Sequence, residues 1–510
     1  MSDTVSSDAK RPSSGGPVIE GTDLQRDAIG LVGATMQCIT HIAPAIAALF
    51  FTQFVVSLAG ITAPLAYLLG VIVVLMLGST LVQLSKHMPS AGGYYTYVSR
   101  ALHPRVGFLT SWMYVLYSPL CGGPIYAYFG FIVSQELKTN YSVSVPWLWW
   151  VCVLVGAPLI AFLQHRGIKI SARMMLILGG LEMLIVFVLS IWGFARPGPG
   201  GFTFAVFDFS KKLSVEGFAL AVVFSIQGLT GWEGAAPLAE ETRNPRRNVP
   251  RATMLSICLL GVFLIIAYWG QILGWGVSKL SSLPTASDLP GLVLAHRYWG
   301  GAWFILLLAF LNTTIAVCLA TANVGTRMWY RMAKGGSFPP ALAKVDPKYK
   351  TPTNAILVQL ALALASGLGV GAWIGADKSF LLIDGLVLVM AVLFVYVVAN
   401  AAVFAYYFWQ RRSDFNIFLH VLFPLISTAG LIYALVYSFI PFPAAPYEYA
   451  PLIDGIWLFL GLVVLLVMWR QHNDRWLLTA GTALGESEET DTGPTARQNR
   501  SRGGERDTVT

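Results

Sequence analysis

Apolar residues in this chain form long runs that short polar segments separate. Twelve runs can be recognised, at about residues 29–57, 62–85, 106–135, 147–164, 172–195, 215–238, 252–275, 301–331, 354–375, 380–409, 416–440 and 452–470. A run of about 20 apolar residues is long enough for a helix to cross the hydrocarbon core of a bilayer. Because helices satisfy their own backbone hydrogen bonds in lipid, the pattern predicts an all-α polytopic membrane protein with twelve transmembrane helices.

Polar sequence lies at both ends of the chain. Residues 1–24 and 476–510 are rich in serine, glycine and charged residues, and such a composition cannot bury a hydrophobic core. We therefore expect two disordered tails around one transmembrane domain, which covers residues 25–475. The first residues show no pattern of a cleavable signal peptide.

The basic residues are distributed unevenly between the polar segments. If the N-terminus is inside, the cytoplasmic loops and tails hold 27 of the 34 lysines and arginines, and the outer loops hold the other 7. Loops rich in lysine and arginine remain on the cytoplasmic side of a membrane. The bias predicts a multi-pass protein of the cell membrane with both termini in the cytoplasm, and it explains the net charge of +8 without nucleic-acid binding.

Several classes of function lack the residues that they require. The five cysteines lie inside apolar runs without CxxC spacing, so the sequence indicates no disulfide, metal site or cofactor. The chain has no GxxxxGK[ST] loop for ATP, no HExxH or GxSxG motif of an enzyme, and no TVGYG filter of a channel. These absences disfavour an ATP-driven pump, an enzyme and a channel.

The sixth apolar run loses its helical character near the middle. Gly228, Gly231 and Gly234 occur at a spacing of three, beside Thr230 and the acid Glu233. Each glycine costs about 1 kcal/mol in a helix interior relative to alanine. Irregular backbone is tolerated at membrane depth only where it is packed in protein or lines a polar cavity. We expect a broken helix at a binding site; a glycine face for close helix packing is the alternative.

The first apolar run has a similar interruption. Thr40, His41 and Pro44 lie at mid-membrane, where polar groups are costly and a proline removes a helical hydrogen bond. A simple proline kink is the alternative explanation. However, five spans separate the two interruptions, and an odd repeat length gives two halves of opposite orientation. Matching broken helices in inverted repeats indicate the binding site of a secondary transporter.

Three segments resemble one known family. They are GWEGAAPLAEETRNPRRNVPRA at residues 231–252, MPSAGGYYTYVSRALHPRVGFLTSW at 88–112 and NVGTRMWYRMAKGGSFPPALAKVDPKYKTPTNA at 323–355. Together they resemble the amino acid–polyamine–organocation (APC) transporter superfamily, and in particular its amino acid permeases, over about residues 25–470. The resemblance implies a five-plus-five inverted repeat with broken helices 1 and 6, followed by two appended helices.

The resemblance also places the substrate at the two breaks. The implied binding residues are Thr40, His41, Ile42, Ala43, Pro44, Gln227, Gly228, Leu229, Thr230, Gly231 and Trp232. Free N–H groups and the positive dipole end of a half-helix suit a carboxylate, and freed carbonyls suit an ammonium group. A zwitterion could thus be held by backbone, with side chains selecting the rest of the molecule.

Two acids within the apolar runs are candidates for ion coupling. Glu233 matches an acid of several family members, and Glu182 aligns where some sodium-independent members carry a lysine. An intramembrane acid indicates a function by default, and burial in an apolar site favours its protonated form. Proton relay, sodium binding, a counter-ion role for a cationic substrate and a structural hydrogen bond all remain open for these acids.

The resulting interpretation is a secondary active transporter that imports amino acids by alternating access, driven by protons. An amine or polyamine importer or exchanger is the alternative, and a sensor without transport is a third. The expected partners are the amino acid or amine, a proton or a sodium ion, and the lipid bilayer.

Overall fold

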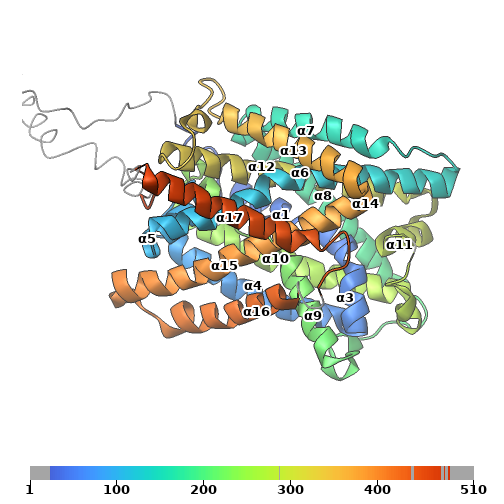
Figure 1. Cartoon of the computed structure of the whole chain (residues 1–510). Helices are drawn as coiled ribbons and strands as arrows, with labels where there is room; N and C mark the ends of the chain where they lie inside the picture. Colours follow the sequence, from blue (N-terminus) through green and yellow to red (C-terminus); the bar gives the residue numbers. More distant parts are fainter. Residues whose placement is uncertain (1–22, 287, 438–441, 472–475, 477–479, 483–510) are drawn as a thin grey trace, which may run out of the picture.

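Long helices that lie side by side make up nearly all of the structure (Figure 1). The computed structural model describes residues 23–286, 288–437, 442–471, 476 and 480–482. Within these residues no β-strand forms, and the single isolated backbone bridge joins Ile29 to Thr242. The tails predicted to be disordered, residues 1–24 and 476–510, lie almost entirely outside the described residues, although Leu24 and Trp476 are described and buried.

Ten helical stretches among the described residues are long and apolar enough to cross a membrane. They are Pro44–Ser85 (α2, Pro44–Leu49; α3, Phe51–Ala59; α4, Ala63–Ser85), α6 (Pro104–Tyr141), α7 (Leu148–His165), α8 (Ile168–Ala195), α10 (Pro245–Trp275), α12 (Phe304–Lys334), α13 (Thr353–Ile374), Ala376–Gln410 (with α14, Ala376–Phe380, and α15, Leu388–Ala405), Phe418–Tyr437 (with α16, Phe423–Tyr437) and α17 (Tyr449–Arg470). The prediction of an all-helical polytopic membrane protein is therefore confirmed. The count of twelve spans and the inverted repeat stay predictions.

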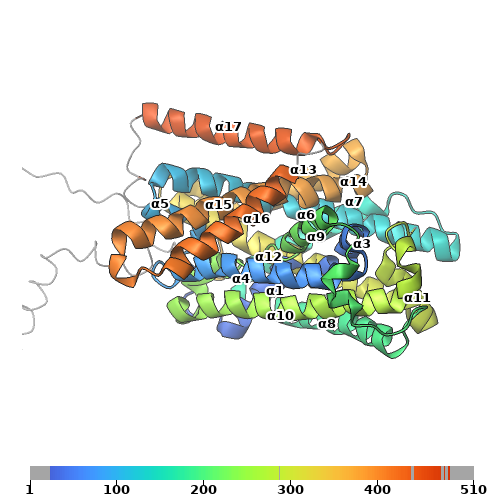
Figure 2. The ribbon, with the colours of Figure 1, turned by 90° about the horizontal axis from the view of Figure 1, so that it is seen from below.

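Four shorter helices complete the arrangement: α1 (Leu31–Ile42), α5 (Tyr94–Ala101), α9 (Val215–Gln227) and α11 (Pro290–Trp299). Helices α3 and α11 lie toward one end of the bundle and α5 toward the other, while α17 runs along the outside (Figures 1 and 2). Helix α1 is interior and packs against α8, α10 and α12. The interior position of α1 puts its interruption in the protein core rather than in lipid.

Helix α1 ends where proline and a left-handed residue interrupt it. Ala43 has φ +60° and ψ +72°, and Pro44 begins α2 directly afterwards. Proline has no N–H and a fixed φ, so it suits the first position of a new helix better than the interior of an old one. The backbone therefore stops and restarts within two residues, both of which are buried.

Helix α9 ends at Gln227, where the glycines begin. The backbone then makes single turns from Gly228 to Ala235, passes through a short 3₁₀ segment at Ala236–Glu241, and resumes as α10 at Pro245. Gly231 has φ +116°, a region that side chains other than glycine rarely adopt. The interruption predicted from glycine spacing is present, and it extends further than the three glycines.

A buried ion pair ties this irregular segment to α12. Arg327 Nε donates to Glu241 Oε2 at 2.9 Å, and both side chains are essentially inaccessible to solvent. The carbonyl oxygen of Glu241 also accepts the backbone N–H groups of Ala28 and Ile29. Glu241 therefore joins the chain before α1, the end of the irregular segment and α12 at one point.

We expect Arg327→Ala to destabilise the protein by about 3–5 kcal/mol, because it leaves the carboxylate of Glu241 buried without its cation. Thermal unfolding of the purified protein in detergent measures the effect. Arg411→Ala is the matched control, since Arg411 pairs with Asp414 at an exposed site, where such a pair contributes less than about 1 kcal/mol. Equal unfolding temperatures for the two variants would contradict a stabilising role of the buried pair.

Candidate functional site

The two interrupted helices meet at one point. The ring nitrogen Nδ1 of His41 lies 3.0 Å from the carbonyl oxygen of Gly231, and because that oxygen can only accept, Nδ1 carries the proton in this bond. A Cβ atom at Gly231 would lie 2.7 Å from the carbonyl carbon and oxygen of His41, and one at Gly234 would lie 2.7 Å from Nδ1 of His41. The glycines thus allow two backbones to touch, as irregular segments at membrane depth require.

Glu233 is enclosed by aromatic side chains from three other elements. Its two carboxyl oxygens accept hydrogen bonds from the hydroxyl groups of Tyr114 on α6, at 2.8 Å, and Tyr396 on α15, at 2.6 Å. The ring of Trp232 lies 5.1 Å from that of Tyr396, and the ring of Tyr94 lies 5.7 Å from that of Tyr114. The carboxyl group is completely buried, and its two donors are neutral.

His41 lies between the break and this aromatic group. Its ring centroid is 5.4 Å from that of Tyr117, which stands one helical turn after Tyr114 on α6. Its second ring nitrogen, Nε2, is buried and has no hydrogen-bond partner among the described residues. A buried polar atom without a partner is costly, so Nε2 is available to a ligand.

Glu182 contacts the other side of the first break. Its Oε2 atom accepts the backbone N–H of Ala45, the second residue of α2, at 3.3 Å. Thr313 of α12 lies beside its carboxyl group, but Oε1 has no hydrogen-bond partner of normal geometry in the described part of the chain. Glu182 therefore occupies the N-terminal end of α2, and no described hydrogen bond joins it to Glu233.

The remaining predicted residues contribute backbone or packing. The hydroxyl group of Thr40 donates to the carbonyl oxygen of Met36 within its own helix. Ile42 is the last residue of α1 and is buried, as is Leu229. Thr230 is buried in the irregular segment, and a Cβ at Gly228 would lie 2.5 Å from the hydroxyl group of Tyr67.

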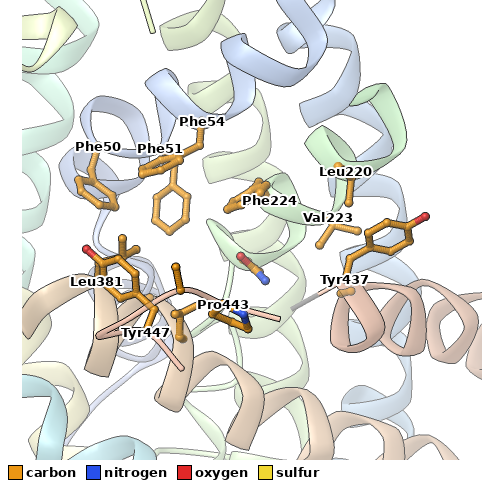
Figure 3. A pocket seen from close by; sticks show the side chains of 15 residues that line it. Phe50, Phe51, Phe54, Leu220, Val223, Phe224, Leu381, Tyr437, Pro443 and Tyr447 are labelled. Carbon is orange, nitrogen blue, oxygen red and sulfur yellow. The ribbon is translucent and has the colours of Figure 1, made fainter. Parts of the chain in front are cut away.

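Gln227 is one of the residues that line a separate cavity of about 310 Å³, which Figure 3 shows from close by. Aromatic rings of Phe50, Phe51, Phe54 and Phe224 surround the cavity, together with residues of the segment Leu381–Leu386 and of the chain between α16 and α17. The cavity borders α3, which follows the first break along the chain, and α9, which precedes the second break. Its position makes it a candidate vestibule to the breaks.

The sequence alone does not identify the tyrosines that hold Glu233. Tyr114 and Tyr396 are 119 and 163 residues away from it along the chain, so no local spacing connects them. A signal did exist near the segment at residues 88–112 that resembles the family, since Tyr94 lies within it and Tyr114 follows its end by two residues. Arg327 lies in another such segment, at residues 323–355, but no local spacing identifies Glu241 as its partner.

The fold and the site define a membrane transporter: an all-helical membrane protein whose interior holds two interrupted helices and a buried acid. Comparison with known sequences agrees. Residues 33–479 match the profile of the family described as "Amino acid permease", and the chain belongs to this family. The resemblance to the APC superfamily is thereby confirmed.

Individual relatives are similar to the chain at moderate identity. The low-affinity putrescine importer PlaP of Escherichia coli (strain K12) is 27% identical over 351 residues, which cover 66% of this chain and 74% of the relative. The serine/threonine exchanger SteT of Bacillus subtilis (strain 168) is 22% identical over 379 residues, 72% of this chain and 81% of the relative. These relatives are transporters rather than enzymes, and their solutes include both an amine and amino acids.

Proposed function

We propose that this protein is a secondary active transporter that imports small solutes carrying an ammonium group, with amines preferred to amino acids. The observation that carries the proposal is the environment of Glu233. Its buried carboxyl group accepts hydrogen bonds from two neutral hydroxyl groups and makes no ion pair within the described residues. An ammonium group of a solute would supply that charge.

The aromatic residues around Glu233 suit the same ligand. The rings of Trp232 and Tyr94 lie 5.1 Å and 6.2 Å from the ring of Tyr396, whose hydroxyl group binds the carboxyl group, and aromatic rings attract ammonium groups. His41 Nε2, which accepts when Nδ1 carries the proton, is a further acceptor for an ammonium N–H. At the first break, the side chain of His41 therefore offers an acceptor to the solute.

A solute carboxylate finds fewer partners at the first break. The N-terminus of α2 would be the expected position for it, but Pro44 has no N–H and Glu182 already accepts the N–H of Ala45. A second carboxylate there would meet the carboxyl group of Glu182. Amino acid import remains the second candidate, because the family as a whole and relatives such as the serine/threonine exchanger favour it.

Uptake of putrescine and of ornithine into liposomes that contain the purified protein separates the two candidates, because the two solutes differ only by the α-carboxylate. We expect putrescine uptake to exceed ornithine uptake by about tenfold or more, the effect of about 1.4 kcal/mol. Glu233→Gln should reduce uptake of both solutes. Higher uptake of ornithine would favour the amino acid candidate, and binding without uptake would indicate a sensor.

We also propose that protons drive this import and that Glu182 or Glu233 carries them. Both acids are buried at the breaks, where a change of charge would be coupled to the movement of α1 and α9. Of the two, Glu182 is the stronger candidate, since one of its oxygens has no partner among the described residues. A sodium ion at Glu182 is the alternative.

Uptake should then increase as the external pH falls, stop when a protonophore is added, and proceed without sodium. Glu182→Gln should abolish accumulation against a gradient but retain exchange of labelled for unlabelled solute, because exchange requires no net proton movement. Thr313→Val is the matched control, since it changes the neighbour of Glu182 without removing an acid. Strict dependence on sodium would contradict proton coupling.

We further propose the cell membrane as the location, with twelve spans, an inverted repeat and both termini in the cytoplasm, on the basis of the uneven distribution of lysine and arginine. Cysteine introduced at the exposed Ala445, between α16 and α17, should react with an impermeant thiol reagent added to intact cells. Cysteine introduced at the exposed Lys348, between α12 and α13, should react only after the cells are opened. The reverse result would invert the orientation.

A further inference from the structure

Four exposed arginines crowd the beginning of α10: Arg243, Arg246, Arg247 and Arg251. None of them makes an ion pair within the described residues. Like charges four residues apart on a helix destabilise it, and Arg247 and Arg251 have this spacing. An anion bound beside them would remove the repulsion.

A cavity of about 540 Å³ lies next to two of these arginines. It is lined by Pro89, Asn244, Pro245, Arg246 and Arg247, so it lies between the beginning of α10 and the loop that follows α4. Its volume falls within the range of pockets for small ligands, about 300–1,000 Å³. The lining contains two guanidinium groups and no acid, and guanidinium groups bind phosphate oxygens in pairs.

The loop after α4 is itself surrounded by positive charge. Burial lowers the pKa of His87, which lies in this loop, to about 4. Arg411, Lys86 and Arg246 contribute to the decrease in the pKa of His87, and Asp414 opposes it. Cations therefore come to this region from three parts of the chain that are distant in sequence.

Beyond the arginines, the same face of α10 is apolar. Leu255, Leu259 and Val262 are exposed, and they follow Arg247 and Arg251 at intervals of three or four residues, which places all five on one side of the helix. Figure 2 shows α10 at an edge of the bundle, and the helix is long and apolar enough to cross a membrane. The face thus changes from cationic to apolar, as a phospholipid changes from headgroup to acyl chains.

We propose that the cavity beside Arg246 and Arg247 binds the phosphate group of an anionic phospholipid, whose acyl chains lie along Leu255, Leu259 and Val262. Basic pockets at the ends of membrane helices suit such headgroups. A free phosphate would occupy only the cationic part of this face, whereas a lipid covers both parts. The site is separate from the one proposed for the solute, and it does not rest on the proposed function.

Native mass spectrometry of the purified, delipidated protein tests the site with three probes: dioleoyl-phosphatidylglycerol, dioleoyl-phosphatidylcholine and glycerol phosphate. They are respectively an anionic lipid, a zwitterionic lipid with the same chains, and an anionic headgroup without chains. We expect phosphatidylglycerol to bind about tenfold or more tightly than the other two. Arg246→Gln together with Arg247→Gln should weaken its binding by about 10- to 30-fold, because each basic residue near an anionic headgroup contributes roughly fivefold.

Arg246→Lys together with Arg247→Lys retains both charges and should keep phosphatidylglycerol binding within about fivefold of the wild type. The matched control is Lys169→Gln together with Arg173→Gln on α8, which also removes two exposed basic residues four positions apart near the start of a spanning helix. These two residues do not line the cavity, so this variant should bind phosphatidylglycerol like the wild type.

Equal binding of the two lipids by the wild type would overturn the site, as would unchanged binding of phosphatidylglycerol after both arginines are replaced by glutamine. The same loss in the α8 variant would overturn it too, because the attraction would then be a general effect of basic residues. Glycerol phosphate bound as tightly as phosphatidylglycerol would overturn the lipid assignment in favour of a free phosphate.

Discussion

The contact between His41 and Gly231 is the constraint on which the interior depends. Backbone without regular helix is tolerated at membrane depth only where it is buried in protein or lines a polar cavity, so that its N–H and C=O groups can find hydrogen-bond partners. The imidazole of His41 donates to the carbonyl of Gly231, and glycine at this position allows the two backbones to approach closely. Without this contact, the carbonyl oxygen of Gly231 would lose its hydrogen-bond partner in the buried interior.

The interlocked breaks determine where the two acids lie. Glu233 follows Gly231 by two residues and is therefore held against α6 and α15, where Tyr114 and Tyr396 reach it. Glu182 comes from α8 and meets the N-terminal end of α2. The two carboxyl groups thus contact different faces of the broken region, and the proposed roles in solute binding and ion coupling are assigned to separate positions.

The sign of the charge that the site favours depends on the hydrogen bonds that its groups already make. Hydroxyl donors surround Glu233, a proline removes one N–H from the start of α2, and Glu182 takes the next. His41 Nε2 remains as an acceptor, and the rings of Trp232 and Tyr396 lie beside the carboxyl group's donors. An environment of this kind stabilises a positive charge better than a negative one, and this preference separates the proposed amine site from one built for a zwitterion.

The sequence by itself determined the class of protein, the helical architecture, and the positions of both breaks. Long apolar runs can only be helices in a membrane, and glycine and proline interrupt a helix locally, so residues 40–44 and 227–234 could be identified without a structure. The number of spans and the repeat symmetry are inferred from the same pattern and stay predictions. Only the tertiary structure decided what each acid touches. Their partners Tyr114, Tyr396 and Arg327 come from helices that are distant along the chain, and the apolar pattern of a helix does not specify which helix it faces. The reason is physical: the interior of a membrane protein is assembled by packing between helices, and lipid imposes the same apolar pattern on all of them.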